Sequence, residues 1–134
     1  MSDKPVYVID GAEFATLEQF YDTISRVLIP NVDWGRNLNA FNDILRGGFG
    51  TPDGGFVLVW KNSMMSRIRL GYPETVRCLE STTYYPSNAS LFAKELEAAK
   101  SQRGATAFDW LVEIIQVHGI GGEEYEDGVE LRLE

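Results

Sequence analysis

The sequence predicts an α/β fold, a three-stranded parallel sheet packed with helices, in one domain over residues 1–134. Three short segments support this prediction: residues 6–9 and 56–60 are rich in the β-branched and aromatic side chains that strands favour, and residues 129–133 alternate apolar and polar side chains. Helical patterns separate these segments, and strands joined through helices pair in parallel with right-handed crossovers. A chain of 134 residues is also long enough to bury one core without disulfides.

The first half of the chain is expected to alternate strand and helix. Residues 6–9 form a continuous apolar run, which is typical of a strand that is buried on both faces. Thr16 should open the next helix as its N-cap, and Gln19 stands three residues later, where a capping box needs it. Pro30 should end that helix, because a proline cannot donate the helical hydrogen bond. Residues 56–60 then predict a second fully buried strand.

The second half of the chain is expected to be mostly helical before a final strand. Residues 63–80 carry at least one helix, interrupted at a Gly-Tyr-Pro sequence, and residues 90–102 carry another. Thr106 and the aspartate three residues later predict the cap of a further helix, which should end at Gly119. Residues 129–133 alternate apolar and polar side chains, so one face of the last strand should be exposed.

The composition predicts an acidic, cytoplasmic protein that does not bind nucleic acid directly. Asp and Glu number 20 against 12 Lys and Arg, a net charge of −8, whereas nucleic-acid binding needs clustered positive charge. An acidic surface suits a basic partner, although solubility alone also explains it. No segment has the apolar length of a membrane span, no signal-peptide pattern opens the chain, and its single cysteine suits a reducing compartment. The acidic run 123–127 is expected to be a solvated turn.

The sequence contains little evidence for a catalytic site or a metal site. His118 precedes the helix-ending Gly119, where it is expected to interact with the negative end of the helix rather than to act as a base. Cys78 lies between Val76 and Leu79 in a helical pattern, which favours a buried and inert thiol. The chain has no cysteine pair, histidine pair or spaced aspartate loop, so we expect no metal and no cofactor. The protein is therefore predicted not to be an enzyme.

The segment 33–45 is the most informative part of the sequence. It indicates a short loop that leads into an amphipathic helix, with Leu38, Phe41 and Leu45 spaced as one buried stripe. The other side of this helix is expected to carry the polar residues Asn39, Asn42, Asp43 and Arg46. In the loop, Trp34 is either anchored in the core or held out as an interface anchor.

This segment resembles the recognition loop and helix of the barstar family, inhibitors of small secreted ribonucleases. The family pattern is an aromatic pair followed by Gly-x-Asn-Leu-Asp-Ala-aliphatic-x-Asp. The positions that match this pattern are Trp34, Gly35, Asn37, Leu38, Ala40 and Asp43. The resemblance covers residues 6–60 well and is weaker over the last helix and strand. Residues 84–103 are longer than in compact members and indicate an added helix.

The resemblance implies that the loop and helix plug the active site of a ribonuclease. Asp43 would take the place of the scissile phosphate and accept charge-assisted hydrogen bonds from guanidinium groups. Trp34 would pack over the cleft, Gly35 would let the backbone approach closely, and Asn37 would order the loop. The partner-binding residues implied in this way are Asp33, Trp34, Gly35, Asn37, Asn39, Asn42, Asp43 and Arg46.

Several departures from the family pattern indicate a target other than the best-known ribonuclease of the family. The first helix acid is replaced by Asn39, the aromatic before the second acid is replaced by Asn42, and the first loop aromatic is replaced by Asp33. Arg46 stands one turn beyond Asp43 and could pair with it. The family also uses an acid near the start of its later helix, and Asp109 lies nearby.

The resulting expectation is a monomeric, cytoplasmic bacterial immunity protein that inhibits a small secreted ribonuclease or a ribonuclease toxin domain. The alternative is an interaction module on the same fold whose partner is not a nuclease.

Overall fold

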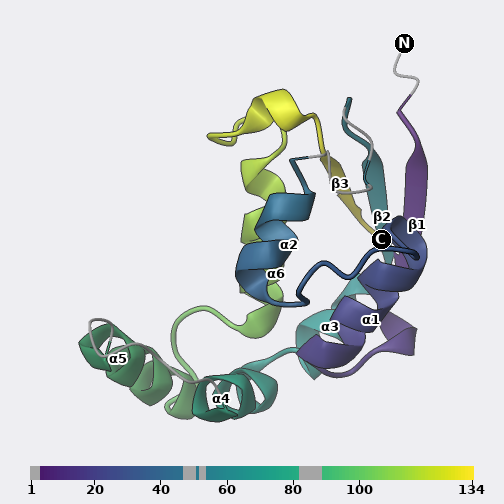
Figure 1. Cartoon of the computed structure of the whole chain (residues 1–134). Helices are drawn as coiled ribbons and strands as arrows, with labels where there is room; N and C mark the ends of the chain where they lie inside the picture. Colours follow the sequence, from purple (N-terminus) through teal and green to yellow (C-terminus); the bar gives the residue numbers. More distant parts are fainter. Residues whose placement is uncertain (1–3, 47–50, 52–53, 82–88) are drawn as a thin grey trace.

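The computed structural model describes residues 4–46, 51, 54–81 and 89–134, and it confirms an α/β architecture (Figure 1). Three strands alternate with six helices, and the 3₁₀ turns η1 (Gly11–Glu13) and η3 (Tyr125–Asp127) complete the described elements. In chain order the strands and helices are β1 (Val6–Asp10), α1 (Leu17–Leu28), α2 (Leu38–Ile44), β2 (Val57–Lys61), α3 (Ser63–Arg69), α4 (Tyr72–Ser81), α5 (Ala89–Lys100), α6 (Ala107–Val117) and β3 (Glu130–Leu133).

The sheet has the order β1-β2-β3, and both strand pairs are parallel, as predicted. β2 is the central strand, and its residues 57–60 are all buried, which confirms the prediction that residues 56–60 form a fully buried strand. The prediction that residues 6–9 are fully buried is wrong, because Val6 is 58% exposed and Val8 is 44% exposed. β1 is an edge strand, and its run of apolar residues does not reveal that position. β3 is largely exposed, in line with its alternating sequence.

Aromatic side chains fill the core between the sheet and the helices. The ring of Trp60 on β2 lies 5.2–5.9 Å from those of Phe14, Phe20 and Phe108, which come from three different parts of the chain. Its indole Nε1 donates a hydrogen bond of 2.9 Å to Ser66 Oγ, so the polar edge of this buried ring is satisfied. The central strand therefore anchors the helices around one shared aromatic cluster.

The predicted helix starts are confirmed, with one difference in detail. Thr16 Oγ1 accepts a hydrogen bond from the Gln19 amide at 3.1 Å, as an N-cap should. Gln19 Oε1 accepts from the amide of Ala15 rather than from that of Thr16, so the reciprocal bond lies one residue earlier than in a capping box. At α6, Thr106 and Asp109 form the complete capping box.

The helices of residues 63–102 divide between the body of the molecule, where α3 contacts η1 and α6, and one end of it, where α4 and α5 lie. The predicted break at Gly-Tyr-Pro is confirmed, since α3 ends at Arg69 and α4 begins at Tyr72. α5 confirms the helix predicted over residues 90–102, and α4 and α5 lie side by side, away from the sheet (Figure 1). Residues 84–88 of the predicted added segment lie outside the described residues. Within the described ranges, no helix is both long and apolar enough to cross a membrane.

A buried carboxylate joins α4 to the start of α1. Glu74 Oε2 accepts a hydrogen bond of 2.8 Å from the Leu17 amide, and Glu74 Oε1 accepts one of 2.6 Å from Arg77 Nε. Burial works to raise the pKa of Glu74, but the hydrogen bonds from Arg77 and Leu17 outweigh it and hold that pKa below its usual range. This carboxylate is thus committed to holding two helices together.

Candidate partner-binding site

The loop before α2 is shaped by short-range hydrogen bonds. The backbone enters the left-handed region at Gly35 (φ +89°) and Arg36 (φ +52°), and the carboxylate of Asp33 accepts from the Gly35 amide at 3.4 Å. The guanidinium of Arg36 forms an ion pair with Asp22 on α1. Asn37 is the N-cap of α2, because its Oδ1 accepts from the Ala40 amide at 2.8 Å. These contacts fix how the loop enters the helix.

Trp34 points into the core, which decides between the two orientations left open by the sequence. Trp34 is only 7% exposed. Its ring packs edge-on against that of Tyr21, with 5.6 Å between the ring centroids, and also lies against the ring of Phe41. Its Nε1 donates a hydrogen bond of 2.7 Å to Ser25 Oγ on α1. The expectation that this ring packs over a partner's cleft is therefore corrected. Trp34 holds the loop against α1 instead.

The inward face of α2 is wider than predicted. Phe41 and Leu45 are buried and Leu38 is half-buried, which confirms the apolar stripe. Asn42, expected on the outer polar face, is half-buried, and its Oδ1 lies 2.7 Å from Nε2 of His118. The helical spacing contained this signal, since position 42 lies four residues after Leu38 and three before Leu45.

The outward face of α2 presents Asn39 and Asp43, one turn apart and both exposed. Just over half of the Asp43 side chain is accessible. Arg46 contacts Asp43 at 3.4 Å, as the sequence suggested, but it makes a shorter ion pair of 2.7 Å with Glu124. The hydrogen bond and the charge of Glu124 raise the pKa of Arg46. The Asp43 carboxylate therefore keeps most of its capacity to accept hydrogen bonds.

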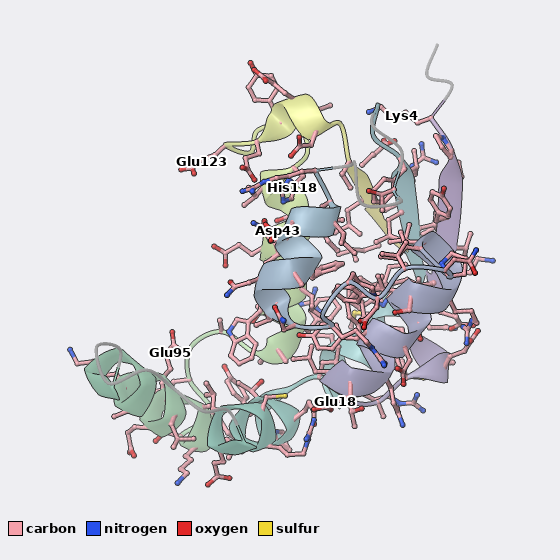
Figure 2. All side chains as sticks on the ribbon, in the orientation of Figure 1. Lys4, Glu18, Asp43, Glu95, His118 and Glu123 are labelled. Atoms are coloured by element: carbon pink, nitrogen blue, oxygen red, sulfur yellow. The ribbon has the colours of Figure 1, made fainter. Side chains whose placement is uncertain are left out.

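The acidic run 123–127 is only partly the solvated turn that the sequence predicts. Glu123 and Glu126 are exposed, whereas Glu124 pairs with Arg46, and Asp127 Oδ2 lies 2.6 Å from Nδ1 of His118. The turn therefore lies against the C-terminal end of α2, and Asp43, His118 and Glu123 occupy the same side of the molecule (Figure 2).

His118 is completely buried at the C-terminal end of α6, and its ring makes side-chain contacts on both edges. His118 is the C-cap of α6, in line with its expected place at the helix end, and its two ring nitrogens face Asn42 and Asp127. Sequence reasoning missed this cluster, since its members come from α2, α6 and the terminal turn. Asp109, near the start of α6, is used by its capping box.

Cys78 is buried, as predicted. Burial, and then the charge of Glu74, raise the pKa of the Cys78 thiol to about 12, so it is protonated at neutral pH and unsuited to nucleophilic attack. The thiol contacts Glu74 Oε2 at 3.4 Å, whereas the ring of His118 lies against Asn42 and Asp127.

Comparison with known proteins supports the resemblance read from the loop and α2. The family model for barstar, described as barnase inhibitor, matches residues 4–83, which include β1, α1, α2 and β2. Among curated proteins, none matches this sequence. The members of this family are inhibitors and not enzymes. The match covers more than half of the chain, and the three strands pair in parallel as expected, so this chain belongs to the barstar family.

Proposed function

We propose that this chain is a ribonuclease inhibitor of the immunity or antitoxin type, which blocks the active site of a small ribonuclease with its loop 33–37 and helix α2. The proposal rests on the exposure and the weak ion pairing of the Asp43 carboxylate. This carboxylate is exposed on α2, and the nearest cation, Arg46, is held more tightly by Glu124 than by Asp43. An aspartate that is exposed and only weakly paired is suited to accept hydrogen bonds from a partner.

The chemistry of the target follows from what Asp43 can accept. A ribonuclease cleft carries cationic groups that hold a phosphodiester, and a carboxylate in that position receives charge-assisted and often bidentate hydrogen bonds. The net charge of −8 would speed the encounter with such a basic cleft. Because Asn39 carries no charge on the same face, the cleft it meets should have fewer cations facing this position.

The proposed contact surface is smaller than the set predicted from the sequence. The accessible members are Asp33, Gly35, Asn37, Asn39, Asp43 and Arg46. Trp34 and Asn42 support this surface from behind through Ser25 and His118. We therefore expect substitutions at Trp34 to act through the stability of the loop and not through lost contact with the partner.

The test is a titration of ribonuclease activity with this protein, using barnase, other small secreted ribonucleases and ribonuclease toxin domains as the panel. We expect one-to-one inhibition of at least one member. Asp43→Ala should weaken it by at least about 2 kcal/mol, roughly 30-fold, which is the threshold of an interface hot spot. The matched control is Glu95→Ala, which removes an exposed carboxylate on α5, away from α2 (Figure 2). Equal inhibition by wild type and Asp43→Ala would refute the assignment.

The second candidate is an interaction module of the same fold with a partner that is not a nuclease. The added helix α5 and the uncharged Asn39 favour keeping this candidate. Capture of partners from a lysate of the source cells separates the two, because a small basic nuclease supports inhibition and another partner supports the module. Absence of inhibition across the whole panel would put the module first. A cytoplasmic location and a monomeric state belong to the same proposal.

A further inference from the structure

A stable complex needs more surface than loop 33–37 and α2 provide. Specific protein–protein interfaces use roughly 20–30 residues on each side. The helix α2 has seven residues, and several residues of the loop and the helix are buried. A nuclease that reaches Asp43 therefore also meets neighbouring parts of this chain. The terminal turn, residues 119–128, is such a part, because it is bonded to the C-terminal end of α2.

Side-chain contacts hold the terminal turn against α2. Arg46 Nη2 forms an ion pair of 2.7 Å with Glu124 Oε1, and the same guanidinium contacts Asp43. The buried ring of His118 contacts side chains of both α2 and the turn. Glu123 lies on the same side of the molecule as Asp43 (Figure 2). The turn is therefore continuous with the proposed contact surface.

The terminal turn exposes two large apolar side chains on a fixed backbone. Ile120 is completely exposed, and Tyr125 is 60% exposed. The backbone on both sides of Ile120 is closely packed, because a Cβ atom at Gly119 or Gly122 would collide with backbone carbonyl oxygens. The Gly122 amide also donates a hydrogen bond of 2.9 Å to the Gly119 carbonyl. A side chain held in place before binding loses less conformational entropy when a partner covers it.

Ile120 and Tyr125 line an open hollow of about 930 Å³ between the terminal turn, α6 and β3. The charged side chains among its described lining residues are three glutamates and one lysine, namely Glu113, Glu123, Glu130 and Lys4. The hollow thus combines apolar surface with an excess of negative charge. Lysine and arginine side chains suit this combination, because their aliphatic stems pack on apolar groups while their charged ends meet carboxylates. The face of a tyrosine ring also attracts such cations.

We propose that this hollow is a second contact site for the nuclease that α2 inhibits, and that it takes a basic segment of that nuclease from outside the active site. This inference rests on the proposed function. Long basic side chains of the segment pack on Ile120 and Tyr125, and their charged ends meet Glu113 or Glu123.

The two contact sites have different roles in recognition. Asp43 meets the phosphate-binding groups that any ribonuclease cleft carries, so it discriminates little between nucleases. The terminal turn lies outside the family match of residues 4–83, and a hollow that reads the surface around the cleft can distinguish one target from another. The hollow therefore contributes target selectivity.

The first experiment compares inhibition constants for the panel nuclease that the wild type inhibits. A double variant, Ile120→Ser with Tyr125→Ala, should inhibit at least roughly tenfold more weakly, because the burial of two apolar side chains is lost. Both side chains are exposed, so the melting temperature should not change. The matched control is Ile68→Ser, which replaces an isoleucine that is 76% exposed on α3 and should inhibit as the wild type does.

Hydrogen exchange of the same complex locates the contact. When the nuclease binds, protection of backbone amides should rise in residues 119–126 as well as in α2. If inhibition depends on Asp43 but protection rises in α2 alone, or if the double variant inhibits as well as the wild type, the hollow is no contact site and the proposed function stands.

A second experiment needs no nuclease. Isotope-labelled protein is titrated with the peptide acetyl-Arg-Leu-Arg-amide and followed by NMR. The amide signals of Ile120 and Tyr125 should shift saturably, and the shifts should shrink in a Glu113→Gln and Glu123→Gln double variant. The control peptide acetyl-Glu-Leu-Glu-amide should leave these signals unchanged. Peptide binding without inhibition of any nuclease would refute the proposed function and keep the hollow as a site for basic segments, whereas no saturable shift with the basic peptide would overturn the inference.

Discussion

Two carboxylates in this molecule have opposite surroundings, and the contrast separates what holds the fold from what is available to a partner. Glu74 is buried at the junction of α1 and α4, where it accepts hydrogen bonds from Leu17 and Arg77 at 2.6–2.8 Å. Asp43 is exposed on α2, with one contact of 3.4 Å to Arg46. A buried carboxylate without partners would be costly, so the neighbours of Glu74 are a condition of folding. Asp43 is exposed, so folding does not require a hydrogen-bond partner for its carboxylate.

The contrast extends to the aromatic and amide residues beside Asp43. Asn42 was predicted on the outer face and the family resemblance implied that Trp34 meets the partner, but both point inward and are hydrogen-bonded to other elements. A binding surface on a seven-residue helix needs support from behind, since the helix is too short to be stable on its own. Some residues around Asp43 therefore support the helix, and others are available to contact a partner. Substitutions should distinguish the two groups.

The largest effect is expected from Trp34→Ala. Removing this buried ring leaves a cavity beside Tyr21 and Phe41, which should lower the free energy of unfolding by about 3–4 kcal/mol. Chemical denaturation measures it. A variant that unfolds like the wild type but no longer inhibits its nuclease would mean that the ring belongs to the contact surface after all.

Glu74→Ala should have the next largest effect. It removes the acceptor of the Leu17 amide and one of the two carboxylates that bond to the Arg77 guanidinium, at a cost of roughly 2–3 kcal/mol in unfolding free energy. The inhibition constant, measured where the variant is folded, should not change. A loss of inhibition without a loss of stability would erase the contrast between the two carboxylates.

The dependence of the unfolding free energy on pH below neutrality provides an independent test of the role of Glu74 in stability. Its pKa is lowered in the folded state, so its contribution is complete above the ordinary value of 4.5 and is lost as the pH falls through the lower folded value. We expect the stability difference between wild type and Glu74→Gln to shrink as the pH is lowered below 4.5. Denaturation at a series of pH values measures this difference, and a constant difference would contradict the account.

Asn37→Ala should have the smallest effect, about 1 kcal/mol of unfolding free energy, because it removes the N-cap of α2. Asn37 is exposed, so the change tests the support of the helix separately from its core. Amide hydrogen exchange should rise first in α2. Unchanged exchange there would show that the packing of Phe41 alone holds the helix.

Much of the fold could be predicted because its signals are local. Thr16, Pro30 and Thr106 mark helix ends through bonds that they make, or cannot make, within four residues. The exposure of β1 could not be predicted, because an apolar run does not tell whether a strand lies at the edge or in the middle of a sheet. That position depends on strand order, which is set by pairing between distant segments.

The candidate site was predictable in its segment and not in its orientation. The order of residues from Trp34 to Asp43 identified the loop and helix, and the family match over residues 4–83 includes them. The partner of Asn42 is His118, which stands 76 positions later and outside that match. No pattern within 33–45 could therefore indicate which polar residues of α2 face inward.

The central claim is that Asp43 is reserved for a cationic partner while Glu74 is committed to the fold. The most direct test measures thermal unfolding and nuclease inhibition together for Asp43→Ala and Glu74→Ala, under one set of conditions, with the nuclease that the wild type inhibits. We expect Asp43→Ala to keep its melting temperature and to inhibit at least about 30-fold more weakly, while folded Glu74→Ala loses stability and keeps inhibition. An Asp43→Ala variant that inhibits as well as the wild type would contradict it.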